Sequence, residues 1–97
     1  MLSLTSVQKS FLRAQAHSLN PVVTIGDAGL TEAVMKEAER SLISHELIKV
    51  KSHSRDKAAR ESQLKEVCET LHAAPVQHIG KILIVYRPAE KPVLVLP

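Results

Sequence analysis

Hydrophobic residues recur three or four positions apart at the start of the chain, which is the spacing of one face of an α-helix. These positions are Leu4, Val7, Phe11 and Ala14. Thr5 and Gln8 have the spacing of a capping box, in which each side chain accepts a hydrogen bond from the other residue's backbone N–H. The pattern predicts a helix over residues 5–17 that ends before Asn20-Pro21.

The pattern then changes to β-branched residues. Val22–Ile25 is short and apolar, which is typical of a buried strand. A tight loop at Gly26–Gly29 leads to a second helix, predicted over residues 31–44 with Thr31 as its N-cap. Its buried positions are expected to be Val34, Ala38 and Leu42, and its exposed positions Glu32, Lys36 and Arg40.

Alternation replaces helical spacing over residues 46–53. Ile48 and Val50 fall on one side of this predicted strand, and the lysines at 49 and 51 fall on the other. A third helix is predicted over residues 56–73, because apolar and charged residues again recur at helical spacing. Its apolar stripe consists of Leu64, Val67, Cys68 and Leu71, and its charged stripe of Lys57, Glu61, Lys65 and Glu69.

Two short strands, Val76–Ile79 and Ile82–Arg87, follow around a hairpin turn at Gly80-Lys81. Residues 93–96 fit either an edge strand or a packed tail. The order α-β-α-β-α-β-β predicts an α/β sandwich with a partly parallel sheet and a final antiparallel hairpin. We expect one domain over residues 1–97, with its core at 4–88 and a tail or edge strand at 89–97.

Composition narrows the function classes. A formal charge of +3 with 44% hydrophobic and 24% charged residues is ordinary for a folded protein and compatible with an anionic partner. The single cysteine cannot form an intrachain disulfide, which fits a reducing compartment. No secretory signal and no apolar stretch of membrane-spanning length stands out, so we expect a cytoplasmic protein without membrane contact.

Signatures of catalysis and of metal binding are not found in the sequence. The five histidines are not paired at ligand spacing, and Cys68 stands alone on an apolar helix face. No nucleophile elbow, nucleotide-binding P-loop or acid–base pair of carboxylates stands out. We therefore expect no catalytic residues, no metal, no cofactor and no small-molecule substrate.

The loop Gly26-Asp27-Ala28-Gly29 is the feature of the sequence with a physical mechanism for binding phosphate. Glycines let a ligand approach the backbone closely, and free N–H groups at a helix N-terminus can bind phosphate. KH domains clamp a nucleic-acid backbone with a G-x-x-G loop. A plain two-glycine turn is the simpler interpretation of the loop alone, and Asp27 adds a negative charge that opposes phosphate binding.

Basic residues in several elements could supply charge beside this loop. They are Lys9, Arg13 and His17 on the first helix, Lys49 and Lys51 on one strand face, Lys81 in the hairpin turn and Arg87 at the end of the last strand. Each alone is usually a solvated surface residue, but together they would form an electrostatic footprint for RNA. Phe11 and Tyr86 are the only aromatic residues, so base stacking is expected to contribute little.

Four segments in a fixed order resemble a known family. They are residues 12–25 (LRAQAHSLNPVVTI), 26–32 (GDAGLTE), 45–51 (HELIKVK) and 79–88 (IGKILIVYRP). The chain resembles the YhbY-like proteins, the stand-alone bacterial form of the CRM domain (chloroplast RNA splicing and ribosome maturation). The resemblance implies a mixed four-stranded sheet in a fold like the C-terminal domain of bacterial initiation factor 3.

The resemblance also implies a partner and a binding surface. The partner is RNA, expected to be ribosomal RNA in precursors of the large ribosomal subunit, and the protein is expected to act as a monomer. The implied contacts are the loop Gly26–Gly29 and the basic positions Arg13, His17, Lys49, Lys51, Lys81 and Arg87. A protein-interaction adaptor on the same fold is the alternative, using the helix faces or residues 93–96. A hydrolase or transferase is a third class of function, and no arrangement of catalytic residues in the sequence supports it.

Overall fold

The computed structural model describes residues 1–97. Its elements are α1 (Ser6–Ala16), β1 (Pro21–Ile25), α2 (Glu32–His45), β2 (Leu47–Ser52), α3 (Lys57–Leu71), β3 (Ala74–Ile79) and β4 (Ile82–Tyr86). This order confirms the predicted α/β fold, and each boundary lies within two residues of its predicted position.

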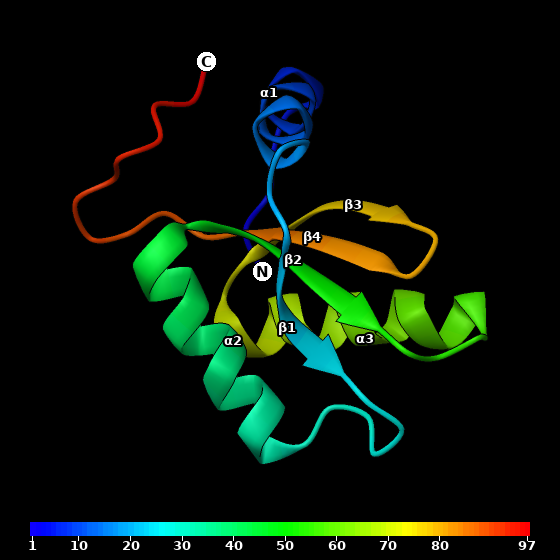
Figure 1. The fold of residues 1–97 in the computed structure, drawn as a ribbon. Coiled ribbons are helices and arrows are strands. Elements are labelled where there is room, and N and C mark those ends of the chain that lie inside the picture. Colours follow the sequence, from blue (N-terminus) through cyan, green and yellow to red (C-terminus); the bar gives the residue numbers. More distant parts are fainter.

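The four strands form one mixed sheet in the order β1-β2-β4-β3. Strands β1 and β2 pair in parallel, and β4 pairs antiparallel with both β2 and β3. The last strand in the sequence is therefore an inner strand, inserted between two strands that precede it (Figure 1).

Helices cover both faces of the sheet, so the molecule has three layers (Figure 1). On one face, α2 and α3 enclose the larger apolar cluster, which contains Val23, Ile25, Leu42, Val50, Leu64, Val67 and Leu83 among others. On the other face, α1 encloses a smaller cluster of Leu12, Ala16, Leu47, Val76, Ile84 and Tyr86. Alternation along β2 explains the division, because successive side chains point to opposite faces of the sheet.

The buried face of α1 differs from the predicted one. The capping box is present, with the Gln8 N–H donating to Thr5 Oγ1 at 3.1 Å and the Thr5 N–H donating to Gln8 Oε1 at 3.0 Å. Leu12 and Ala16 are fully buried, whereas Val7 is 65% exposed. The prediction was therefore right for Leu4 and Phe11, which pack against the smaller cluster, and wrong for Val7 and Ala14, which are exposed.

Strand β1 is an edge strand rather than a buried one. Val23 and Ile25 point into the larger cluster, while Val22 and Thr24, which alternate with them, are exposed. The apolar stripe of α3 is confirmed, because all four of its predicted members are buried. No helix is both long enough and apolar enough to cross a membrane.

The C-terminal segment packs as a tail, which decides between the two alternatives that the pattern left open. Leu94 and Leu96 lie against the smaller cluster, and residues 93–96 form no strand. The carboxylate of Glu46 fixes the tail by accepting hydrogen bonds from the backbone N–H groups of Ala89, Val93 and Leu94 at 2.9 to 3.1 Å.

Glu46 itself is 4% exposed and joins α2 to β2 with a φ of 62°. Burial alone would raise the pKa of this carboxyl, but the three N–H donors together hold its pKa below the ordinary value. No feature of the sequence marked this residue as an anchor for the tail.

Candidate nucleic-acid interface

The glycine loop is a tight turn that precedes α2 without belonging to it. The Gly29 N–H donates to the Gly26 carbonyl oxygen at 3.0 Å, and the Thr31 N–H donates to the Gly29 carbonyl oxygen at 3.0 Å. Thr31 is the N-cap, and its Oγ1 accepts from the Val34 N–H. Two residues thus separate the loop from the first helical turn, whose leading N–H groups have no partner within the helix.

The two glycines of the loop differ in their conformation. Gly29 has a φ of 76°, a left-handed conformation that explains glycine at this position. Gly26 has no positive φ, and a Cβ atom placed there would meet no atom within 4 Å. Neither the backbone nor the packing of the chain requires glycine at position 26. A ligand that approaches the backbone closely at this position would require the absence of a side chain.

The loop lies at the same end of the sheet as the β3–β4 turn. The His53 N–H donates to the Ile25 carbonyl oxygen at 2.9 Å, which holds the end of β1 against the end of β2. The Ser52 N–H donates to the Lys81 carbonyl oxygen at 2.8 Å, which holds the hairpin turn against the other side of β2. Figure 1 shows the loop, the hairpin turn and the start of α3 on the same side.

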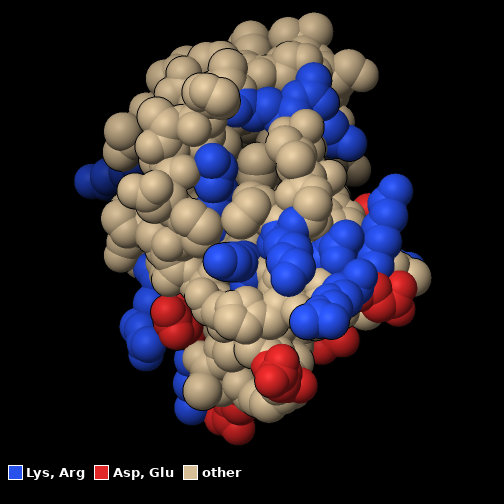
Figure 2. All heavy atoms as spheres, turned by 45° about the vertical axis from the view of Figure 1, so that its right-hand side comes forward, with Lys and Arg blue, Asp and Glu red and all other residues tan.

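Basic residues gather at this end. Lys51 is exposed and pairs in register with Thr24 of β1 and Ile82 of β4, beside Lys81. Lys49 is half-buried on the same face of β2. Figure 2, which brings this side forward, shows a group of Lys and Arg side chains over the end of the sheet and a second group above it. Acidic residues lie mainly below and to the side.

Three basic residues of this end were not among the sequence candidates. Arg55 and Lys57 are exposed in the connection to α3 and in its first turn. The guanidinium of Arg60 donates to the Ser54 carbonyl oxygen at 2.9 Å. Lys57 was predicted on the charged stripe of the third helix, and the sequence holds no signal that α3 begins beside the β3–β4 turn.

The basic residues of α1 lie apart from the loop. Helix α1 packs over the first half of β3, where Lys9 shares a shallow hollow with Pro75 and the N-terminal residues. Arg13 is exposed and donates to Ser10 Oγ at 3.0 Å, and His17 caps the C-terminal end of the helix. These three residues share the sheet face of Lys49 and Lys51, but nothing in the fold places them at the loop.

Arg87 has hydrogen-bond partners within the chain. Its guanidinium donates to both carboxylate oxygens of Glu39, at 2.7 and 3.2 Å, and to the Leu71 carbonyl oxygen at 3.0 Å. The side chain is 19% exposed on the side of the sheet covered by α2 and α3. Through these contacts Arg87 connects β4 to both helices.

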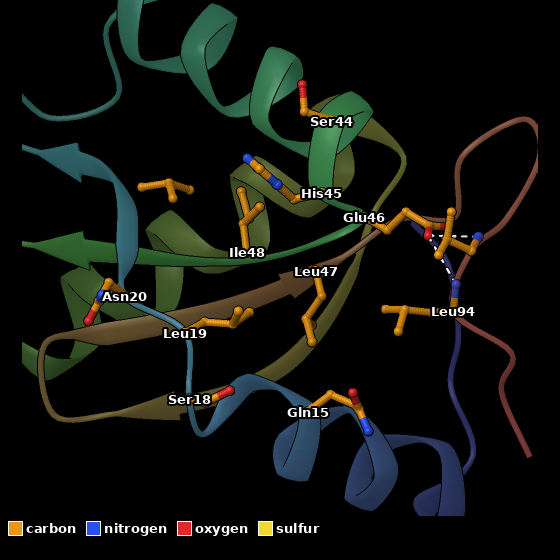
Figure 3. A pocket seen from close by; sticks show the side chains of 12 residues that line it. Gln15, Ser18, Leu19, Asn20, Ser44, His45, Glu46, Leu47, Ile48 and Leu94 are labelled. Carbon is orange, nitrogen blue, oxygen red and sulfur yellow. Dashed lines mark hydrogen bonds between the residues drawn. The ribbon is translucent and has the colours of Figure 1, made fainter.

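A cavity of about 600 Å³ lies at the opposite end of the sheet (Figure 3). It is lined by the ends of α1 and α2, the start of β1 and the tail, with Leu19, Val22 and Leu94 among its apolar residues. Glu46 borders it, but its carboxylate is hydrogen-bonded to the tail.

Burial raises the pKa of the Cys68 thiol to about 12, so this cysteine is a core residue and a poor nucleophile.

Comparison with known proteins identifies the family. The sequence model of the CRS1/YhbY (CRM) domain matches residues 4–87. The chain belongs to the CRM domain family. A Haemophilus influenzae relative named an RNA-binding protein is 45% identical over 97 residues, which are 100% of this chain and 98% of the relative. A probable RNA-binding protein of Pseudomonas aeruginosa is 42% identical over 91 residues, covering 94% of this CRM domain chain and 88% of the relative.

A solved structure confirms the fold of this CRM domain. The solution structure of a hypothetical Staphylococcus aureus protein, described as a candidate for RNA binding, superposes with a TM-score of 0.86. It is 31% identical and covers 98% of this chain and 100% of its own. The names of the two curated relatives describe RNA binding.

Proposed function

We propose that this CRM domain binds RNA with the end of the sheet that carries the loop Gly26–Gly29. The observation that carries the proposal is the convergence of this loop with Lys51, Lys81 and Arg55 at one end of the molecule. These residues come from separate elements of the sequence, and the β-ladder brings them together. The RNA-binding names of the relatives support the same conclusion.

The mode of contact follows from the side chains available. Tyr86 is 3% exposed, and Phe11 packs on the cluster beneath α1, so neither aromatic ring is free to stack on a base. Binding would therefore rest on phosphates, with cations attracting the RNA backbone and the open side of Gly26 admitting it closely. We expect weak discrimination between base sequences and a strong dependence on salt.

We further propose that the RNA is ribosomal RNA in precursors of the large subunit, whose assembly the protein would aid as a cytoplasmic monomer. The support is the resemblance to stand-alone bacterial CRM proteins. Sedimentation of cell extract at low salt tests this part, with the protein expected to move with large-subunit precursors. A protein that remains entirely at the top of the gradient would contradict it.

Binding measurements on charge variants test the surface. We expect the logarithm of the affinity for a labelled RNA to fall linearly with the logarithm of salt concentration between about 50 and 200 mM. Changing both Lys51 and Lys81 to Gln should reduce the magnitude of this slope by about 2, or about 1 per lost phosphate contact. Lys36→Gln with Lys65→Gln is the matched control, because these lysines pair with Glu32 and Glu69 on outer helix faces.

Equal slopes for the two double variants would show that this end of the sheet is not part of the binding surface.

The adaptor alternative has its own supporting observation, the apolar cavity between α1, α2 and the tail. Partner binding that survives high salt and is lost when residues 93–97 are deleted would favour the adaptor over RNA binding.

A further inference from the structure

A histidine with a largely covered side chain connects two of the elements that carry the basic residues. His78 lies on β3 with its side chain 7% exposed. Its Nδ1 is 2.5 Å from the Glu61 carboxylate. Its Nε2 is 2.9 Å from the Gly80 carbonyl oxygen in the β3–β4 turn and 3.1 Å from Nε of Arg60 on α3. The ring therefore lies between the second turn of α3 and the hairpin turn.

These contacts cannot all be hydrogen bonds in one protonation state. A carboxylate only accepts, so Nδ1 carries a proton toward Glu61. In the neutral ring, Nε2 has a lone pair that accepts from the Arg60 Nε–H, and the Gly80 carbonyl oxygen then has no donor at this atom. In the protonated ring, Nε2–H donates to the Gly80 oxygen, and Arg60 then faces a second cation without an acceptor.

We infer that His78 is a positioning residue that holds either Arg60 or the β3–β4 turn, depending on one proton. The neutral ring fixes the Arg60 guanidinium, which also donates to the Ser54 carbonyl oxygen. The protonated ring fixes the turn that carries Lys81 and releases the Arg60 Nε–H. Imidazole is the side chain whose charge ordinarily changes between about pH 5 and 8.

The surroundings of the ring set the direction of the effect. Helix α3 contributes one anion and one cation, Glu61 and Arg60, and the hairpin contributes the neighbouring Lys81. Leu83, the register partner of His78 on β4, is apolar. Protonation adds one positive charge and frees a second donor at the basic end. This inference rests on the proposed RNA binding. It predicts that RNA affinity increases about fivefold as the pH falls, because one charge beside a phosphate in water has an effect of this size.

The arrangement can be tested without RNA by nuclear magnetic resonance of the whole chain. As the pH is lowered from about 8 to 5, the ring nitrogens of His78, the Nε–H of Arg60 and the amide of Lys81 should shift with one common midpoint. His78→Gln should abolish the shift at Arg60. His53→Gln is the matched control, because His53 is an exposed imidazole at the same end, and the common midpoint should remain.

A second measurement connects the network to binding. At constant salt, RNA affinity at pH 6 should exceed that at pH 8 for the wild-type chain, and His78→Gln should lose a larger part of this difference than His53→Gln does. The inference is overturned if Arg60 and Lys81 resonances stay fixed while the ring titrates, or if the ring keeps one charge throughout. The wild-type titration decides this even if His78→Gln fails to fold. Absence of RNA binding at every pH would instead contradict the proposed function.

Discussion

The guanidinium of Arg87 and the carboxylate of Glu39 form a bidentate ion pair, with N–O distances of 2.7 and 3.2 Å. The pair joins the end of β4 to the middle of α2, and the third bond of Arg87 reaches the carbonyl oxygen of Leu71 at the end of α3. One side chain thus connects three elements on the face of the sheet remote from α1.

This connection predicts that Arg87 contributes to stability and not to RNA binding. Arg87→Gln leaves Glu39 and a helix-end carbonyl without their donor, so the free energy of unfolding should fall by about 1–3 kcal/mol. Urea denaturation measures this loss, and RNA affinity of the folded variant should stay within twofold of the wild type. Lys81→Gln is the opposite case, with unchanged stability and weaker binding. A large loss of affinity in Arg87→Gln would restore this residue to the interface.

Substitutions at the two glycines of the loop distinguish an effect on conformational strain from an effect on contact with RNA. Gly29→Ala forces an L-residue into a left-handed conformation, so it should cost about 1 kcal/mol of stability. Gly26→Val introduces a side chain into open space and should change stability by less than about 0.5 kcal/mol. If RNA approaches the loop closely, Gly26→Val should nevertheless weaken binding at least threefold in fluorescence anisotropy. Unchanged affinity would show that the backbone of the loop is not a contact.

The Glu46 carboxylate predicts a stability loss in acid. Its pKa is lower in the folded chain than the value of about 4.3 expected when unfolded, so its contribution is fully present above that pH. The contribution should disappear as the pH falls below about 4.3 and through the lower folded value. Glu46→Gln should remove this part of the dependence, and thermal unfolding from pH 7 to pH 3 would measure it. Parallel stability profiles for the two chains would contradict this role of the tail anchor.

The positive φ at Glu46 gives a separate prediction. Alanine and glycine both delete the carboxylate, but only glycine is free of strain at a φ of 62°. Glu46→Gly should therefore be about 1 kcal/mol more stable than Glu46→Ala, although both are less stable than the wild type. Denaturant unfolding of the two variants compares them directly, and equal values would mean that the α2–β2 junction relaxes without strain.

Periodicity predicted the fold well because its strongest signals lie on elements with one buried face. Alternation in β2 placed Ile48 and Val50 in the larger cluster, and the stripe from Leu64 to Leu71 was buried as expected. Helix α1 was harder, because it is covered only on one side by a small cluster, and Val7 continues an apolar repeat in solvent. The sequence contains both repeats, and only the position of the sheet selects between them.

The candidate site was predictable in part. The loop and the lysines of β2 and the hairpin were found from local sequence, but their convergence depends on β4 lying between β2 and β3. The same topology explains the omissions, since Arg60 and His78 are 18 residues apart and meet only when α3 packs along β3. The ion pair of Arg87 was not predicted, because its carboxylate partner, Glu39, is 48 residues away and carries no local signature.

The inner position of β4 also has a consequence for the order in which the chain acquires structure during synthesis. Strand β3 has β4 as its only neighbour in the sheet, and β2 exposes one edge until β4 arrives. A nascent chain that ends before residue 82 therefore has a two-stranded fragment and an unpaired strand, and both apolar clusters lack the residues that β4 contributes. Completion of the sheet must therefore wait until β4, which ends at Tyr86, has left the ribosomal exit tunnel.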